Sequence, residues 1–339
     1  MDRGPMDQFA ATLDRGWDLV SRGDLAGAML SAEKTLELDA QSPEAHNLMG
    51  YVFAAEGHAE EALDHYRQAI DLDEGFVEAM LNAAELLIHP LGDHEAALKL
   101  IDDALDLSEG DDEIADTMLL KFDALVHQGN KEAAARVIAA LPDGPFENPS
   151  LDFMIGRAKF EIGDVDGAEP RIRRALEQDK ENPDAHYYMA LVHEARGNMR
   201  DATVCFLHAR DLDLQMDNPP WTMPADQFEA RVQAAIQKLP KELAAALDGS
   251  LVVVAEAPGV EVVADGVDPR VTVLLEDLAD IKVGAAPRVG RVFVYQRNVE
   301  RVAVGPGEVE DEVARAIEIE LGAAFPALIQ KPETPPANH

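Results

Sequence analysis

The chain has 339 residues, 47% of them hydrophobic and 5% aromatic, which is enough to bury a large core in two or three domains. It carries 65 acidic and 29 basic residues, a formal net charge of −36. A field of that sign repels the phosphates of nucleic acids and of anionic membranes, so we exclude nucleic acid as a partner. The acidic excess either keeps an alanine-rich chain in solution or attracts a basic partner, and both interpretations stay open.

The first residues show no basic region followed by an apolar run. No stretch approaches the roughly 18 apolar residues that a membrane span needs. We therefore expect a cytoplasmic protein without membrane insertion. The single cysteine, Cys205, excludes an intramolecular disulfide and is expected to be a small buried residue.

Glycines recur through the first two thirds of the chain at a nearly constant step of 34, 35, 37, 34 and 34 residues. These glycines are Gly23, Gly57, Gly92, Gly129, Gly163 and Gly197. An alanine follows most of them five residues later. A fixed step of this length predicts helix-turn-helix units that stack into a solenoid. We therefore predict a mainly α-helical fold, with about six repeats over residues 9–214.

The second unit shows the pattern most clearly. Gly50 allows its two helices to approach, and Gly57 turns the chain between them. Ala62 sits at the close helix contact, and Tyr66 fills the space before the next unit. This pattern resembles the tetratricopeptide repeat (TPR) family, and the fifth and sixth units match it in the same way. The resemblance implies an α-solenoid and does not specify a ligand.

The resemblance also implies that the first helix of each pair lines a concave groove for a partner's peptide or helix. Residues spaced i, i+3 and i+7 along such a helix share one face. The candidate groove residues are Leu13, Trp17, Asn47, Tyr51, Leu81, Glu85, Leu119, Asp123, Phe153, Arg157, Tyr187 and Leu191. Only Asn47 and Arg157 fit the clamp that some family members use for acidic chaperone tails, so we exclude that subclass. For Trp17 and Tyr187, packing between repeats and anchoring of a ligand both stay open.

The ten histidines show no metal-like spacing with cysteine or paired acids. His89 and His94 bracket the turn of the third repeat and are interpreted as solvated turn residues. We therefore predict no metal site, no cofactor and no chemistry in the repeats.

The period stops after Leu214, and the proline-rich residues 215–224 are predicted to be a linker. The elements expected beyond it are helices over residues 226–238, 241–247 and 308–324, and strands over residues 251–255 and 291–295. Residues 225–330 are thus predicted to form a small α+β domain. Residues 331–339 are predicted to be a disordered tail.

The second domain contains an ordered set of residues: Met223-Pro224, Gln227-Phe228, Val232, Ala235, Leu239-Pro240, Val252-Val253-Val254 and Val292-Phe293-Val294-Tyr295. This order resembles that of the small bacterial zincin-like metallopeptidase family. In that family a helix carries H-E-x-x-H, whose histidines hold zinc and whose glutamate activates the bound water. Here Ile319 and Ala323 occupy the histidine positions, and Glu320 keeps that of the glutamate. No histidine or cysteine lies between Leu214 and Asn338, so we expect an inactivated domain with a vestigial Glu320.

These patterns predict a scaffold or adaptor whose repeats bind a protein or peptide partner, basic or apolar in character. The degenerate domain would add a second docking surface and catalyse nothing. Two alternatives stay open. One is a zinc metallopeptidase with an atypical site, its metal held by carboxylates or by a solenoid histidine such as His193 or His208. The other is a chaperone-like assembly factor whose acidic groove shields a basic client.

Overall fold

The computed structural model describes residues 5–279 and 287–326. The chain divides into two compact units, Met1–Gln178 and Asp179–His339, and each has its own hydrophobic core. The tail predicted for residues 331–339 lies outside the described residues, as do residues 327–330 of the predicted zincin-like domain.

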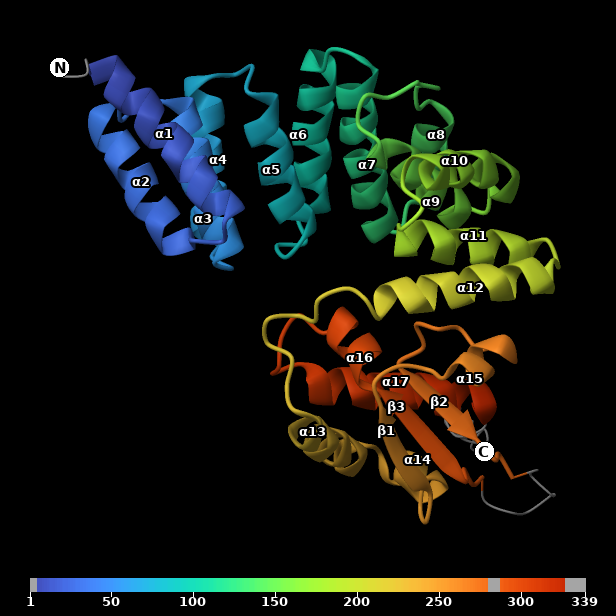
Figure 1. The fold of residues 1–339 in the computed structure, drawn as a ribbon. Helices are drawn as coiled ribbons and strands as arrows, with labels where there is room; N and C mark the ends of the chain where they lie inside the picture. Colours follow the sequence, from blue (N-terminus) through green and yellow to red (C-terminus); the bar gives the residue numbers. More distant parts are fainter. Residues whose placement is uncertain (1–4, 280–286, 327–339) are drawn as a thin grey trace, which may run out of the picture. The chain divides into compact units, whose positions relative to one another are not determined.

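The described part of the first unit is entirely helical (Figure 1). Its helices are α1 (Pro5–Ser21), α2 (Leu25–Leu38), α3 (Pro43–Ala55), α4 (Ala59–Leu72), α5 (Val77–Ile88), α6 (His94–Leu107), α7 (Asp111–His127), α8 (Lys131–Ala139), α9 (Ser150–Glu161) and α10 (Val165–Gln178). The most extensive contacts join each odd-numbered helix to the next even-numbered one. The unit is therefore a series of helix pairs, as the glycine period predicts.

Glycine sets both the turn and the spacing within a pair. Gly57, between α3 and α4, has a φ of +84°, a left-handed conformation that other residues adopt at a cost. Gly50 lies inside α3, where a Cβ would lie 2.6 Å from the ring of Tyr66 and 3.1 Å from the carbonyl oxygen of Ala62. Glycine thus lets α3 and α4 pack more closely than any larger residue would.

The first helices of the pairs form an inner row. Contacts join α1 to α3, α3 to α5, α5 to α7 and α7 to α9. Within the described ranges, no contacts of similar extent join the second helices to one another. Successive pairs are therefore closer together along their first helices, and these helices line the concave side of the unit.

A buried ion pair holds the loop between α8 and α9. The side chains of Arg171 and Asp152 are only 8% and 9% exposed, and Arg171 Nη1 donates to Asp152 Oδ1 at 3.0 Å. Arg171 Nη2 donates to the carbonyl oxygen of Pro142 at 3.3 Å, and the guanidinium lies 5.5 Å from the centre of the Phe146 ring. The half-exposed Arg174 binds the same carboxylate at 2.9 Å.

The second unit contains the sixth helix pair and all three strands of the described chain. Its elements are α11 (Pro183–Ala195), α12 (Met199–Asp213), α13 (Ala225–Lys238), α14 (Lys241–Ala246), β1 (Leu251–Ala255), α15 (Val260–Ala264), β2 (Val273–Glu276), β3 (Arg291–Tyr295), α16 (Gln296–Val302) and α17 (Val309–Ala324). The strand order is β1-β3-β2, with β1 parallel and β2 antiparallel to β3. Helices α13 and α17 pack against each other, and their apolar faces share a core with the sheet.

The predicted helices and strands of this region are present to within one or two residues. The sequence analysis missed strand β2 and helices α15 and α16, which have 4, 5 and 7 residues. Such short elements contain too little periodicity to be distinguished from loops. The domain boundaries at residues 214 and 225 stay predictions.

The sixth helix pair shares an apolar cluster with the segment that follows it. Ala190 of α11, Phe206 of α12 and Val263 of α15 are buried together. The carboxy-terminal segment therefore covers part of this pair inside the second unit.

Candidate functional site

The predicted groove residues lie on the first helices of the pairs, but in both units. Helices α1, α3, α5, α7 and α9 carry ten of them in the first unit. Tyr187 and Leu191 lie on α11 in the second unit.

The amino-terminal part of this face is apolar and partly open. The rings of Trp17 and Tyr51 meet edge to face, with centroids 5.4 Å apart. Tyr51 is 39% exposed, and Leu13 and Trp17 are half-buried. Trp17 thus packs against the next repeat, which agrees with the packing interpretation of this residue.

Asn47 has a different environment from its neighbours. It is buried, its amide nitrogen donates to Glu78 Oε1 at 3.0 Å, and its amide oxygen accepts from Asn82 at 3.1 Å. Glu78 and Asn82 belong to α5, so this side chain links the second repeat to the third. Its hydrogen-bonding groups are occupied within the protein.

The middle of the face forms a depression of about 250 Å³. It is lined by Glu85, Asp116, Leu119, Leu120, Phe122, Asp123, Met154, Arg157 and Ala158. The structure thus brings together four of the predicted residues, Glu85, Leu119, Asp123 and Arg157. Leu81 and Phe153 are half-buried and lie outside its lining.

The depression is lined by three carboxylates, one guanidinium and five apolar side chains. Burial, and then the nearby Asp112, raise the pKa of Asp116. A cation placed here would favour the charged form of that carboxylate. The guanidinium of Arg157 lies 3.3 Å from Glu161 and is thereby partly neutralised. The arrangement suits a positively charged group attached to an apolar one.

Asp116 was missed in the sequence analysis although a signal for it exists. It lies three residues before Leu119 and seven before Asp123, so the i, i+3, i+7 rule places all three on one face. Met154 was also missed, and its neighbour Phe153 was chosen instead.

A second cluster on this unit includes His89, which is exposed at the turn, as the sequence analysis expects, and also contacts Asp123. His89 Nε2 lies 3.2 Å from Asp123 Oδ2. His127 Nδ1 lies 3.7 Å from Asp123 Oδ1, and the two imidazole rings meet edge to face with centroids 4.3 Å apart. One potential ligand atom from each residue lies within 4.8 Å of the others. Spacing along the chain does not show this arrangement because His89 belongs to the preceding repeat.

Tyr187 is in contact with the carboxy-terminal segment of its own unit. Its hydroxyl donates to Asp268 at 2.7 Å, and the guanidinium of Arg270 lies 4.4 Å from the centre of its ring. The ring also packs against Phe206, and Leu191 joins the same apolar cluster. Burial, and then Asp268, raise the pKa of the Tyr187 hydroxyl.

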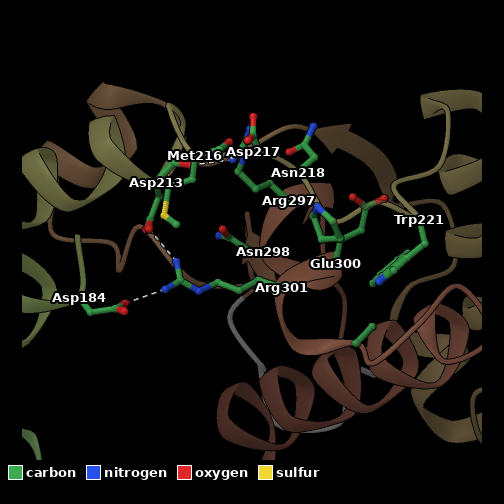
Figure 2. Close-up of a pocket in the computed structure, with 12 residues that line it drawn as sticks. Asp184, Asp213, Met216, Asp217, Asn218, Trp221, Arg297, Asn298, Glu300 and Arg301 are labelled. Atoms are coloured by element: carbon green, nitrogen blue, oxygen red, sulfur yellow. Dashed lines mark hydrogen bonds and ion pairs between the residues drawn. The ribbon is translucent and has the colours of Figure 1, made fainter. Parts of the chain in front are cut away.

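The second unit also contains a pocket of about 440 Å³ (Figure 2). It is lined by Asp184 of α11, Asp213 of α12, residues of the following segment, and one side of α16. Figure 2 shows Arg301 between the two aspartates, and each carboxylate is 2.7 Å from it. Arg270 also binds both aspartates, at 2.7 and 2.9 Å. We call Asp184, Asp213, Arg270 and Arg301 the arginine clasp.

Arg297 and Glu300 of this pocket also make hydrogen bonds. Arg297 donates to the carbonyl oxygens of Asp213 and Met216 at 2.6 and 2.9 Å. Glu300, only 2% exposed, accepts from the backbone nitrogen of Met223 at 3.2 Å. Because these charged groups pair with one another or with backbone, they hold α11 and α12 to the segment that follows them.

Helix α17 carries the positions compared with the zinc-binding motif. Ile319 is 56% exposed, and Ala323 is exposed one turn later. Glu320 is half-buried, and burial raises the pKa of its carboxyl. Two hydrocarbon side chains offer a metal no lone pair, so these positions contribute no ligand.

The fold of the first unit defines a helical-repeat protein with a concave inner row of helices. Two segments of the chain, residues 43–76 and 153–203, match the tetratricopeptide repeat family. Proteins built from these repeats mediate protein–protein interactions. A comparison with curated proteins finds no match to this chain.

Two solved structures share the fold. The structure from the study "Functional Characterization of Pseudomonas Aeruginosa pilF" is 17% identical, with a TM-score of 0.52 over 62% of this chain and 94% of that one. PilW, titled a "widely conserved type IV pilus biogenesis factor", is 18% identical, with a TM-score of 0.50 over 60% of this chain and 92% of that one. At these identities the likeness concerns the fold alone.

Among residues 5–279 and 287–326, the helices are all too short or too polar to cross a lipid bilayer.

Proposed function

We propose that this protein is an interaction scaffold whose tetratricopeptide repeats bind a peptide or helix of a protein partner in their concave groove. The observation that carries this proposal is the depression on α5, α7 and α9. Glu85, Asp116 and Asp123 provide negative charge, and Leu119 and Met154 provide apolar surface. We infer a partner that presents a lysine or arginine next to an apolar side chain.

Charge over the whole repeat region supports a basic partner. Residues 1–214 hold 45 acidic and 18 basic residues, so a cationic segment would be attracted before contact is made. We expect Asp116 to contribute most to binding. Its carboxylate is partly desolvated in the free protein, and a bound cation would compensate for that cost.

We further propose that residues 225–330 form a catalytically inactive, zincin-like domain that provides a second docking surface. Ile319 and Ala323 in the ligand positions support this proposal. Peptide hydrolysis by the purified chain that is abolished in Glu320→Gln would instead establish a peptidase with an atypical site.

The groove proposal can be tested with a fluorescent amphipathic peptide of lysine and leucine, and with a matched peptide in which glutamate replaces lysine. Asp116→Asn removes one carboxylate from the depression. Asp103→Asn removes one from the exposed surface of α6 and serves as the control. A lost charge-assisted hydrogen bond is worth about 1.5–3 kcal/mol, which corresponds to roughly tenfold or more in Kd.

We expect Asp116→Asn to weaken binding of the lysine peptide by that factor and Asp103→Asn to leave it nearly unchanged. Equal effects of the two substitutions would contradict binding in the depression. Salt distinguishes the scaffold from a chaperone-like factor for basic clients. Binding that disappears at high ionic strength favours charge-led capture of a client, and binding that persists favours a specific groove with apolar anchors.

A further inference from the structure

We propose that His89, Asp123 and His127 form a binding site for a divalent first-row transition metal such as Zn²⁺. Two neutral imidazoles and one carboxylate are a donor set that suits zinc, nickel or copper better than magnesium or calcium. The residues come from two elements: His89 directly follows α5, and Asp123 and His127 both belong to α7.

The spacing of the donor atoms is close to what a metal requires. Metal–nitrogen and metal–oxygen bonds of about 2.0–2.2 Å at tetrahedral angles place neighbouring ligand atoms roughly 3.3 Å apart. Here His89 Nε2 lies 3.2 Å from Asp123 Oδ2, and the potential ligand atoms of all three residues are within 4.8 Å of one another. Side-chain rotations would bring one donor atom from each residue onto a shared ion.

The orientation of one imidazole is already fixed. His127 Nδ1 lies 2.9 Å from the backbone carbonyl oxygen of Asp123, to which it donates in the neutral ring. The Nε2 atom of that tautomer keeps its lone pair and can bind a metal. Ligating histidines in metalloproteins commonly donate their other ring nitrogen in this way.

The repeat architecture explains why the three residues meet. His89 directly follows α5 and Asp123 lies on α7, and these first helices of the third and fourth units contact each other. His127 follows Asp123 by one helical turn and lies on the same face of α7. A bound ion would therefore connect the third repeat to the fourth.

The site is open to solvent, since the three side chains are between 35% and 48% exposed. Three protein ligands leave at least one coordination position for water or for a donor group from another molecule. Asp123 also lines the depression described above, so the ion would lie at the edge of that depression. If the proposed groove function holds, metal binding would reduce the negative charge that a basic partner encounters.

Zinc titration of the full chain tests the site without any peptide. The protein is prepared without a polyhistidine tag, treated with chelator, and titrated by calorimetry at neutral pH. His89→Ala and His127→Ala each remove a ligand. His58→Ala is the matched control, because His58 is an exposed histidine that pairs with a single carboxylate, at 3.8 Å, in the equivalent turn of the second repeat.

We expect one zinc ion per chain in the wild type and in His58→Ala, and affinity at least about tenfold lower in His89→Ala and His127→Ala. Circular dichroism checks that the variants remain folded. Asp123→Asn keeps the shape of its side chain, and the same loss is expected there if an alanine variant unfolds. A wild type that binds no zinc, or substitutions that leave its affinity unchanged, would overturn the proposal.

Discussion

Removing one member of the buried ion pair between Asp152 and Arg171 should lower the free energy of unfolding of the fifth repeat. Removing one member of a buried ion pair costs about 3–5 kcal/mol, because the other charge is left without compensation. In Arg171→Met, Asp152 would keep Arg174 at 2.9 Å. We therefore expect the lower end of this range, about 3 kcal/mol.

A double-mutant cycle isolates the pair. Asp152→Leu combined with Arg171→Met leaves neither charge behind, so its stability should lie within about 1–2 kcal/mol of the wild type, with the unpaired carbonyl of Pro142 as the main remaining cost. The control Arg174→Ala removes a half-exposed partner and should cost at most about 1 kcal/mol.

The measurement is the free energy of urea unfolding, followed by far-UV circular dichroism, for the wild type, Arg171→Met, Asp152→Leu, the double variant and the Arg174→Ala control. Hydrogen exchange of the α9 and α10 amides locates the change. If Arg171→Met costs less than about 1 kcal/mol, or if the two single effects simply add, the pair is not coupled as its burial implies.

Three further predictions concern packing, charge and the second unit. Gly50→Ala should lower the thermal unfolding temperature. Overpacking against Tyr66 costs about 1–3 kcal/mol, which exceeds the helix-propensity gain of about 1 kcal/mol. An unchanged or higher unfolding temperature would refute the close approach of α3 and α4 at this position. Asp116→Asn should stabilise the protein to urea at neutral pH. The raised pKa of Asp116 means that its ionised form opposes folding. The gain in stability should therefore vanish as the pH falls through that pKa and below the ordinary aspartate value. A gain that persists in acid would contradict burial as the cause. Tyr187→Phe removes the hydrogen bond to Asp268 and should cost the second unit about 1.5–3 kcal/mol in urea unfolding, whereas a neutral result would show that solvent replaces the bond.

The sequence predicts the repeats well because their packing is local. Positions such as Gly50 and Gly57 act on helices that are neighbours along the chain, and so the same pattern recurs wherever the same contact is made. Strands β1 and β3 are predictable for a related reason, since each is a short, mainly apolar run close behind a glycine, Gly249 or Gly290.

Contacts between distant segments could not be predicted in this way. Arg301 binds Asp184 across 117 residues of chain, and no pattern around either residue indicates a partner. The cluster of His89, Asp123 and His127 is an intermediate case. Asp123 and His127 lie one helical turn apart on α7, which the sequence shows, but no pattern in the sequence brings His89 to them.

The arginine clasp has a consequence for how such an array can change its length. Repeat proteins gain or lose units by duplication and deletion, and a new unit needs a free neighbouring face on which to stack. Arg270 and Arg301 join the sixth helix pair to the segment after it, so a unit inserted at that junction would separate them from Asp184 and Asp213 and leave four charges without partners. Evolutionary variation in repeat number should therefore occur upstream of α11.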